Sequence, residues 1–349
     1  MRFPGGPIMA RSCHYRFVGI RSLVTRCRAV VLPRFGAPEV LQLRDDVDVP
    51  QLESRDVLVR TRAVSVNPLD NRVRCVPGYG RSIFEPLLPL ILGRDVSGEV
   101  AAVGPRVRSL AVGQQVFGAL HPTAVRGTYS DYAVLSEEEL IPKPDLISHV
   151  DASAIPFAAL TAWRALKGTA RIAEGQRVLV IGGGGAVGFA AIQIAAANSC
   201  HVVTTCGGQS TARALAAGAE QAVDYTVEDI ELAIKGKFDA VLDTIGASET
   251  ERIGEAASLS DRYGIAVGLP MATAILLKKQ FQYRYSHGIE YWWTYMRADP
   301  DGLHEIRSLC ECGKLSIPVD KTFPISQVKE AHEAKDKRLI PGKVVLELD

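Results

Sequence analysis

The stretch Arg177-Val-Leu-Val-Ile-Gly-Gly-Gly-Gly-Ala-Val-Gly188 decides the fold of this 349-residue chain. Its first part, residues 178–181, is a continuous run of valine, leucine and isoleucine, which is typical of a parallel strand buried on both faces. Four glycines follow, and small residues from Ala186 to Ala197 then predict a helix. This order predicts a dinucleotide-binding unit, and the alternative is a glycine-rich turn in another kind of α/β protein.

Three glycines of the turn match the pattern G-x-G-x-x-G, namely Gly183, Gly185 and Gly188. In this pattern the first glycine permits the tight turn, the second lets a pyrophosphate approach the backbone, and the third lets the helix pack closely on the strand. The backbone N–H groups of Ala186, Val187 and Gly188 open the helix, and a helix N-terminus favours an anion. We therefore expect these five residues to bind the cofactor.

The segment after the second predicted strand, residues 201–205, bears on which dinucleotide binds. NAD-binding proteins usually place an acidic residue about twenty positions after the glycine turn, where it binds the ribose 2′-hydroxyl. Residues 204–213 contain no acidic residue, so nothing there would repel a 2′-phosphate. Ser210, Thr211 and Arg213 are candidate phosphate partners, and the alternative for Arg213 is a solvated helix position. The sequence therefore favours NADPH over NADH.

Basic charge is concentrated at the N-terminus. Residues 1–28 hold six arginines and no acidic residue, and removing these six charges takes the formal net charge from +1 to −5. An arginine-rich, serine-containing segment without acids is typical of a mitochondrial targeting peptide, and the alternative is a disordered basic tail. Because the remainder is acidic, we expect no nucleic-acid binding. The seven cysteines lack C-x-x-C spacing, which favours free thiols.

The rest of the chain divides into two regions with different sequence patterns. From Arg28 to Asp151, short β-type runs alternate with turns, which predicts a compact, barrel-like β-rich domain. A helix predicted over 152–166, with Asp151 as its cap, is followed by alternating strands and helices, which predict a doubly wound parallel sheet. Residues 342–348 form a last apolar strand that could rejoin the first domain. A chain of this length suits two domains.

Several phrases besides the glycine turn carry a family resemblance. They are Ala29-Val-Val-Leu-Pro-Arg-Phe-Gly-Ala-Pro-Glu-Val-Leu41, Val66-Asn-Pro-Leu-Asp70, Gly93-Arg-Asp-Val-Ser-Gly98, Pro156-Phe-Ala-Ala-Leu-Thr-Ala-Trp163 and Asp243-Thr-Ile-Gly246. From Arg28 to Asp349 the chain resembles the zinc-independent quinone oxidoreductases of the medium-chain dehydrogenase/reductase superfamily. Within that group, its N-terminal segment and residues 288–296 resemble the reticulon-interacting mitochondrial oxidoreductases.

The resemblance implies a GroES-like, β-rich catalytic domain with a doubly wound Rossmann domain inserted into it. The implied segments are a targeting segment (1–28), the first part of the catalytic domain (29–151), an NADP-binding Rossmann domain (152–287) and a return to the catalytic domain (288–349). Zinc-dependent relatives use a metal to polarise the substrate oxygen. At their ligand positions this chain has Asn67 and Arg94, so the resemblance implies no metal site.

The same resemblance places Asn67 and Tyr79 beside the nicotinamide. Tyr79 could act as a general acid, because a phenol can give a proton to the oxyanion or carbanion formed as hydride arrives. It could instead stack on a flat quinone or only pack in its loop. Asn67 would help to hold substrate or nicotinamide, and Asp70 is expected to orient the loop rather than to transfer a proton.

Three further residues are expected near the cofactor. Thr161 corresponds to a family threonine near the nicotinamide, and the alternative is a buried hydroxyl bonded to its own helix. Asp243 and Gly246 follow a predicted strand at the carboxyl edge of the sheet, where ligands bind in such folds. We expect these two to line the cofactor cleft through their backbone.

Aromatic residues gather in two runs, 281–285 and 291–296. Three interpretations compete for them: domain core, a surface for a homodimer or another partner, and a wall for an isoprenoid tail or a membrane interface.

These observations together predict a mitochondrial, NADPH-dependent oxidoreductase that passes hydride to a quinone or similar conjugated carbonyl without zinc. It would act in the matrix, and association with the inner membrane or with a mitochondrial complex stays open. One alternative is a 2-enoyl-thioester reductase, which needs a tunnel for an acyl chain. Another is a non-catalytic assembly partner of a mitochondrial complex that keeps NADPH for structure.

Overall fold

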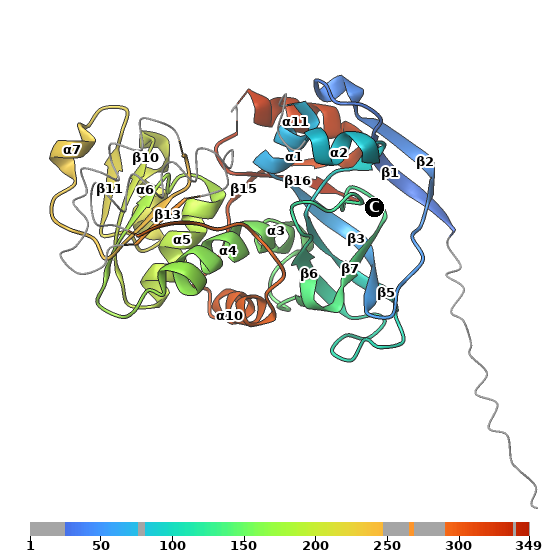
Figure 1. Ribbon diagram of the computed structural model, residues 1–349, viewed down its shortest axis with the longest axis horizontal. Helices are drawn as coiled ribbons and strands as arrows, with labels where there is room; N and C mark the ends of the chain where they lie inside the picture. Colours follow the sequence, from blue (N-terminus) through green and yellow to red (C-terminus); the bar gives the residue numbers. More distant parts are fainter. Residues whose placement is uncertain (1–24, 76–80, 247–264, 269–289, 338–339, 349) are drawn as a thin grey trace, which may run out of the picture.

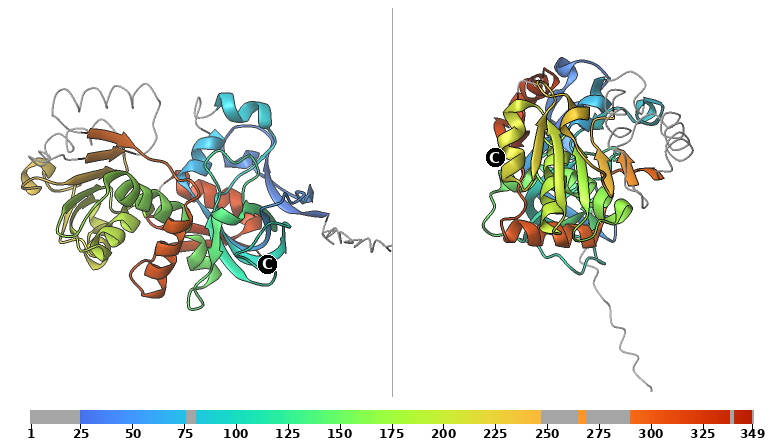
Figure 2. Two further views of the ribbon diagram at one scale, coloured as in Figure 1. Left: turned by 60° about the horizontal axis from the view of Figure 1, so that its bottom comes forward. Right: turned by 90° about the vertical axis from the view of Figure 1, so that its left-hand side faces the viewer.

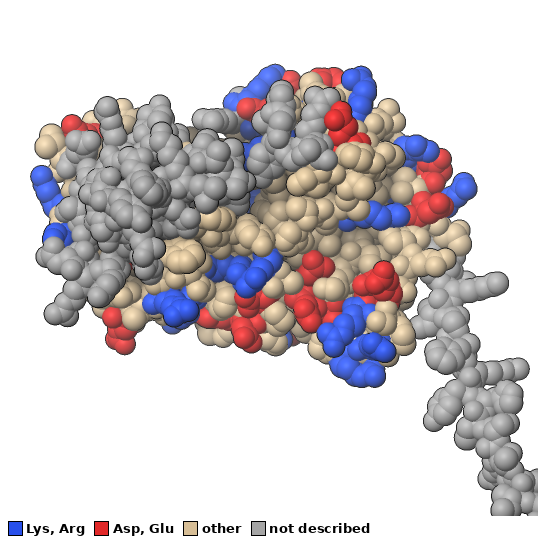
Figure 3. Space-filling model, viewed as in Figure 1, with Lys and Arg blue, Asp and Glu red and all other residues tan. Residues whose placement is uncertain are grey.

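The computed structural model describes residues 25–75, 81–246, 265–268, 290–337 and 340–348. Within these ranges a β-rich domain lies beside an α/β domain built on a parallel sheet (Figure 1). No helix in the described part of the chain is long and apolar enough to cross a membrane. On the face shown in Figure 3, basic and acidic side chains are interspersed.

The β-rich domain contains a seven-stranded sheet and a small three-stranded one. The order is β15-β16-β3-β5-β6-β8 with β7 on β3 in the first, and β2-β1-β4 in the second. The strands are β1 (Arg26–Leu32), β2 (Gln42–Asp48), β3 (Asp56–Val66), β4 (Leu90–Ile91), β5 (Asp95–Val103), β6 (Gln115–Ala119), β7 (Tyr132–Ser136), β8 (Leu140–Pro142), β15 (Val319–Pro324) and β16 (Lys343–Glu347). The last strand therefore rejoins the first domain, as the sequence predicts.

Short helices connect these strands. They are α1 (Pro68–Cys75), α2 (Arg81–Phe84), α3 (His149–Ser153) and α11 (Val328–Asp336), with the 3-10 turns η1 (Pro38–Val40), η2 (Glu85–Leu87), η3 (Glu137–Glu139) and η5 (Ile325–Gln327). Strand β1 begins at Arg26, so the last three residues of the predicted targeting segment belong to the folded domain. Arg28 is held there by an ion pair with Asp131, at 3.0 Å.

The second domain has six parallel strands in the order β11-β10-β9-β12-β13-β14, which stand side by side in the right-hand view of Figure 2. Numbered within the domain, this is the order 3-2-1-4-5-6 of a Rossmann fold, which confirms the predicted doubly wound sheet. The strands are β9 (Arg177–Ile181), β10 (His201–Cys206), β11 (Gln221–Asp224), β12 (Ala240–Asp243), β13 (Ile265–Gly268) and β14 (Glu290–Trp293). Strand β14 completes this sheet, so the Rossmann fold extends past residue 287, the boundary predicted from the sequence.

The helices of the second domain are α4 (Pro156–Trp163), α5 (Ala186–Ala197), α6 (Gly208–Ala216), α7 (Ile230–Ala233) and α10 (Pro300–Glu311), with a π-helical segment η4 (Arg164–Ala170). Helix α5 has the bounds that the sequence predicts. The single helix expected over 152–166 is wrong. The chain forms α3, breaks, and begins α4 at Pro156, because proline has no N–H to continue a preceding helix. The cap is Ser148, whose hydroxyl accepts from the Asp151 N–H at 3.0 Å, rather than Asp151.

One hydrophobic cluster spans both domains. Ala63, Phe117 and Ala119 of the β-rich domain pack in the same cluster as residues of α4, α5 and β9. Because this core is shared, the two domains are held in a fixed relation at α4, beside the edge where the glycine turn lies.

Candidate cofactor cleft and active site

The glycine turn joins β9 to α5, and its own N–H groups are partly used within the fold: Gly182 and Gly183 donate to the Thr205 carbonyl oxygen, at 3.1 and 2.9 Å, and Gly185 donates to that of Gly182, at 3.1 Å. Gly182 has φ +89°, a conformation that side chains disfavour. The first i→i−4 bond of α5 runs from Phe189 N to Gly185 O, at 2.8 Å. The N–H groups of residues 186–188 precede this bond, so they have no partner within the helix. Such free N–H groups at a helix N-terminus are the arrangement that binds a pyrophosphate.

Close packing explains why this turn needs glycine. A Cβ atom on Gly183 would lie 2.1 Å from the Thr204 hydroxyl oxygen, and one on Gly188 would lie 2.2 Å from the Gly182 carbonyl oxygen. A Cβ on Gly185 would meet only the Gly182 carbonyl oxygen, at 3.6 Å, and so points into open space. The first and third glycines thus permit the close approach of strand, turn and helix, and the second leaves room above the turn. This geometry fits a dinucleotide.

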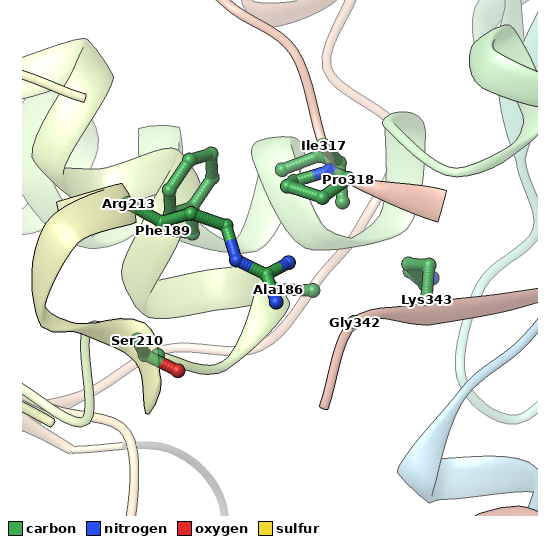
Figure 4. A pocket seen from close by; sticks show the side chains of 9 residues that line it. Ala186, Phe189, Ser210, Arg213, Ile317, Pro318, Gly342 and Lys343 are labelled. Atoms are coloured by element: carbon green, nitrogen blue, oxygen red, sulfur yellow. The ribbon is translucent and has the colours of Figure 1, made fainter. Parts of the chain in front are cut away.

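A cavity lies against this turn, between the two domains (Figure 4). Its lining from the Rossmann side includes Gly184, Ala186, Ser210 and Arg213, and the guanidinium of Arg213 points into it beside Ala186. The opposite wall comes from the C-terminal part of the chain: Ile317, Pro318, Gly342 and Lys343.

Two of the three candidate phosphate partners, Ser210 and Arg213, therefore line the cavity from α6, and Thr211 does not. Ser210 stands against the glycine turn, since a Cβ on Gly184 would be 2.9 Å from its hydroxyl oxygen. Arg213 reaches the other way and pairs with Asp320 of β15, with Nη1 and Oδ1 3.1 Å apart. Arg213 is thus an ion-paired residue of the cleft and not a solvated helix position.

An acidic residue that the sequence-based prediction overlooked also lies near α6. Asp224 ends β11, the strand next to β10, and a Cβ on Gly208 would lie 2.4 Å from its Oδ2 atom. Hydrogen bonds from the Thr226 side chain and backbone, and from the Gly208 N–H, lower the pKa of Asp224. A carboxylate therefore does approach the first turn of α6, from the neighbouring strand.

Asn67 belongs to a buried polar cluster at the end of three neighbouring strands. It follows β3, and its Oδ1 accepts from Lys343 Nζ at 2.7 Å while its Nδ2 donates to Asp95 Oδ2 at 2.9 Å. Lys343 also donates to Ser65, at 2.7 Å, and pairs with Asp95, at 3.0 Å. Lys343 and Asp95 are 2% and 0% exposed at the side chain, so the pair is shielded from water. The cluster fixes which way the Asn67 amide points.

Asp95 extends this cluster to the helix that carries Thr161. Its Oδ1 accepts from the Phe157 N–H at 2.6 Å, in the first turn of α4, where a helix favours an anion. Thr161, one turn further on, is buried and donates its hydroxyl to the Phe157 carbonyl oxygen at 2.7 Å. The alternative of a hydroxyl bonded to its own helix therefore describes Thr161 in this structure.

Asp70 orients the loop after β3, as predicted. Its Oδ2 accepts from the Asn67 N–H at 2.8 Å, and its Oδ1 accepts from the Gly93 N–H at 3.0 Å. Burial raises the pKa of Asp70. Burial, with the nearby Asp70 carboxylate, also raises the pKa of Tyr129 well above 10, which keeps that phenol protonated. The Tyr129 hydroxyl donates to Asp70 Oδ2 at 3.4 Å.

Two family models match the chain, "Alcohol dehydrogenase GroES-like domain" over residues 53–145 and "Zinc-binding dehydrogenase" over residues 217–346. The "NAD(P)H oxidoreductase RTN4IP1, mitochondrial" of Bos taurus is 32% identical over 353 residues, covering 91% of this chain and 88% of the relative. The chain belongs to the medium-chain dehydrogenase/reductase superfamily. It is accordingly an oxidoreductase with a nicotinamide cofactor.

Other members of the superfamily extend the likeness. The "2-methylene-furan-3-one reductase" of Solanum lycopersicum is 29% identical, covering 93% of this chain and 80% of the relative. The solved structure of the quinone oxidoreductase from Coxiella burnetii superposes with a TM-score of 0.82 at 30% identity, covering 93% of this chain and all of that one. GroES-like and Rossmann domains are therefore shared along nearly the whole chain.

Asn67 and Arg94 are the residues that the family resemblance implies at the zinc-ligand positions. Asn67 is bonded as described above, and Arg94 donates to the carbonyl oxygens of Gly93, at 2.8 Å, and Pro122, at 3.1 Å. No group of three or more histidine, cysteine, aspartate or glutamate side chains in the described residues could hold a metal ion. The six cysteines within the described ranges are free thiols, as predicted.

Asp243 and Gly246 form the turn after β12. The Gly246 N–H donates to Asp243 Oδ1 at 2.9 Å, and Gly246 has φ +72°. The Asp243 carboxylate thus shapes this turn at the carboxyl edge of the Rossmann sheet by accepting from backbone N–H groups. Tyr79, the predicted acid, lies outside the described residues, as does the aromatic run 281–285.

The second aromatic run divides between interior and surface. Met296 is buried in the shared core, and Trp293 packs on a smaller cluster under the sheet. Trp292 and Tyr295 are 47% and 44% exposed. The ring of Tyr295 meets His121 of the β-rich domain edge to face at 5.8 Å, so part of this run seals the contact between the two domains.

Sequence reasoning missed Lys343, Asp95, Asp224 and Asp320 in this superfamily member. A signal for Lys343 was present, because a lysine opens the otherwise apolar run Gly342-Lys-Val-Val-Leu346. Asp95 likewise opens a buried strand. Asp320 carries no such signal, since it lies in a mixed segment and its partner is 107 residues away.

Proposed function

We propose that this chain is a mitochondrial oxidoreductase that uses NADPH to reduce a quinone or similar conjugated carbonyl, and that it does so without zinc. The observation that carries the proposal is the placement of Ser210 and Arg213 in the cavity that faces the glycine turn. A hydroxyl and a guanidinium beside a helix N-terminus are groups that bind a phosphate. The dinucleotide's 2′-phosphate would lie there, with its pyrophosphate on residues 186–188.

Asp224 is the one observation that favours NADH, because a carboxylate can accept from a ribose 2′-hydroxyl and repels a 2′-phosphate. Two facts weigh against that role. Its oxygens are already engaged by Thr226 and Gly208, and it does not line the cavity as Ser210 and Arg213 do. We therefore propose NADPH as the preferred cofactor.

The reacting end follows from the buried cluster. Bound NADPH would supply hydride to the acceptor. Lys343 and Asp95 hold the Asn67 amide in one orientation, ready to position nicotinamide or substrate, and Tyr79 would donate the proton that the reduced carbonyl needs. At the positions that the resemblance assigns to zinc ligands, Asn67 and Arg94 offer an amide and a guanidinium in place of the thiolate and imidazole groups that bind zinc, which supports zinc-free chemistry.

The acceptor class is supported by two relatives, a quinone oxidoreductase and a 2-methylene-furan-3-one reductase, since the substrates in both names are carbonyls conjugated to a carbon–carbon double bond. The test is a substrate screen with purified protein and NADPH. Oxidation of NADPH with a soluble quinone is expected. Activity with 2-enoyl thioesters alone would overturn the quinone assignment, and cofactor binding without any reduction would favour the assembly-partner alternative.

Replacement of Tyr79 by phenylalanine tests its role as the acid. Tyr79→Phe should lower kcat by about 10²-fold, the usual size of a general-acid effect, while the Kd for NADPH stays the same. Replacement of the exposed Tyr225 by phenylalanine provides a matched control. If Tyr79→Phe turns over as fast as the control, another group donates the proton.

The mitochondrial location is proposed from the arginine-rich segment 1–28 together with relatives named as mitochondrial. Fusing residues 1–28 to a fluorescent protein should direct it to mitochondria, and replacing the first four arginines of the segment by glutamine should abolish import. A fusion that remains outside mitochondria would overturn this part of the proposal.

A further inference from the structure

The ion pair between Arg213 and Asp320 joins the two domains beside the cofactor cavity. Arg213 belongs to α6 of the Rossmann domain and lines the cavity, and Asp320 belongs to β15 of the catalytic domain. Three hydrogen bonds join them, at 3.1, 3.3 and 3.4 Å. The pair thus engages a residue of the cavity that we propose to take the 2′-phosphate.

The two partners differ in how firmly they are held. Asp320 Oδ2 also accepts from the Gly342 N–H at 2.8 Å, and a Cβ on Gly342 would lie 2.6 Å from the Asp320 carboxyl carbon. The carboxylate is therefore anchored against backbone that only glycine allows. The Arg213 side chain is 39% exposed, and its guanidinium donates its hydrogen bonds to Asp320. An incoming phosphate would therefore move Arg213, and Asp320 would stay.

Asp320 has a second cation nearby when Arg213 leaves. Lys335 is mostly buried on α11, and its Nζ donates to the Gly342 carbonyl oxygen at 2.7 Å. Burial lowers the pKa of Lys335 to about 8, and the attraction between its ammonium and the Asp320 carboxylate opposes this shift. Asp320 therefore keeps a positive neighbour after Arg213 turns to a phosphate, which limits repulsion between the released carboxylate and the ligand.

We propose that Asp320 is a specificity-determining residue, an internal competitor that occupies Arg213 until a 2′-phosphate displaces it. The inference rests on the proposed NADPH site. A guanidinium binds phosphate and carboxylate with the same two-pronged geometry, so a 2′-phosphate that takes the Nη1 and Nη2 donors of Arg213 replaces their hydrogen bonds to the Asp320 carboxylate. Asp320 thereby weakens NADPH binding and leaves the affinity for NADH, which lacks this phosphate, nearly unchanged.

The test compares Kd values for NADPH and NADH, measured by isothermal titration calorimetry on the full-length protein. Asp320→Asn keeps an acceptor for the Gly342 N–H and removes the charge. Because partly exposed ion pairs are weak, the Kd for NADPH should fall about threefold to fivefold, and that for NADH should change less than twofold. Asp46→Asn removes the same charge from another exposed arginine pair, on β2, and should change neither value.

A double variant separates competition for Arg213 from a general effect of charge. In an Arg213→Gln background, Asp320→Asn should no longer tighten NADPH binding. Equal tightening in both backgrounds, or equal tightening of NADH, would mean that Asp320 acts by long-range repulsion and would overturn the inference.

The inference and the proposed function fail in different ways. If Arg213→Gln weakens NADPH binding while Asp320→Asn leaves it unchanged or weakens it, Arg213 binds the phosphate without an internal competitor, and only the inference falls. If Arg213→Gln leaves the Kd for NADPH unchanged, the proposed 2′-phosphate site falls and the inference with it. Thermal unfolding of each variant should match the unsubstituted protein within a few degrees, which ensures that the Kd values describe folded protein.

Discussion

Replacement of Lys343 by methionine tests the buried cluster that fixes Asn67. The change keeps most of the side-chain volume and removes an ammonium bonded to Ser65, Asn67 and Asp95. Asp95 would remain as a fully buried carboxylate without its counter-charge. Breaking a buried pair by removing one partner costs about 3–5 kcal/mol, because the desolvated charge left behind is no longer compensated.

Urea unfolding followed by tryptophan fluorescence measures this loss. With a denaturant slope of about 3 kcal/mol per molar urea, the expected cost lowers the unfolding midpoint by roughly 1–1.7 M. Lys337→Met is the matched control, since Lys337 pairs with Glu333 on the surface, where both side chains are more than half exposed. Surface pairs contribute less than about 1 kcal/mol, so its midpoint should move by less than about 0.3 M.

A double variant gives a further check on the same reasoning. Adding Asp95→Asn to Lys343→Met removes the uncompensated charge, and the double variant should be more stable than Lys343→Met alone. The reasoning is refuted if Lys343→Met unfolds at the same urea concentration as Lys337→Met, because the buried pair would then contribute no more than a surface one.

Two other predictions concern the glycine turn and acid stability. Gly188→Val should raise the Kd for NADPH at least tenfold, because a Cβ there would lie 2.2 Å from the Gly182 carbonyl oxygen. The control for calorimetric titration is Gly168→Val, where a Cβ meets nothing within 4 Å. Equal Kd values for the two variants would show the prediction to be wrong. Burial, together with Arg74, lowers the pKa of His332 to about 3. Below pH 6.5 the His332 imidazole therefore binds a proton in the unfolded chain but not in the folded chain. The free energy of unfolding falls as the pH decreases from 6.5 to about 3, and the loss is about 3 kcal/mol at pH 4.5. Urea unfolding at several pH values should show a smaller loss of stability at acid pH for His332→Gln than for the unsubstituted protein. His201→Gln, at an exposed histidine, is the control and should leave the loss unchanged. Equal pH dependence in the two variants would mean that His332 does not cause the loss.

The glycine turn could be predicted because its determinants are local. A buried strand, a helix of small residues and glycines at fixed spacing lie within about twenty residues, and the structure places β9 and α5 where these patterns predict. The alternation of strands and helices likewise predicted the parallel sheet, because each element carries its own periodicity. The break at Pro156 is also a local signal, but the prediction of one helix over 152–166 overlooked it.

The cluster around Asn67 could not be predicted in the same way. Asn67 meets Lys343 across 276 positions and Asp95 across 28, and only the pairing of β3 with β5 and β16 brings them together. Asp224 was overlooked for a related reason. The sequence pattern expects an acid along the chain directly beyond β10, whereas the carboxylate arrives from the next strand of the sheet.

The pairing of β16 with β3 also affects how the protein can be made. Val344, Val345 and Leu346 bond to residues 64–66, so the first half of the β-rich sheet gains this neighbour only when the last residues of the chain have left the ribosome. Until then Asp95 has no ammonium beside it, and the edge of β3 that receives β16 is unpaired along these residues. A chain shortened by ten residues would therefore lose both the strand and Lys343. We expect such a chain to bind chaperones or to aggregate, even though its glycine turn would be intact.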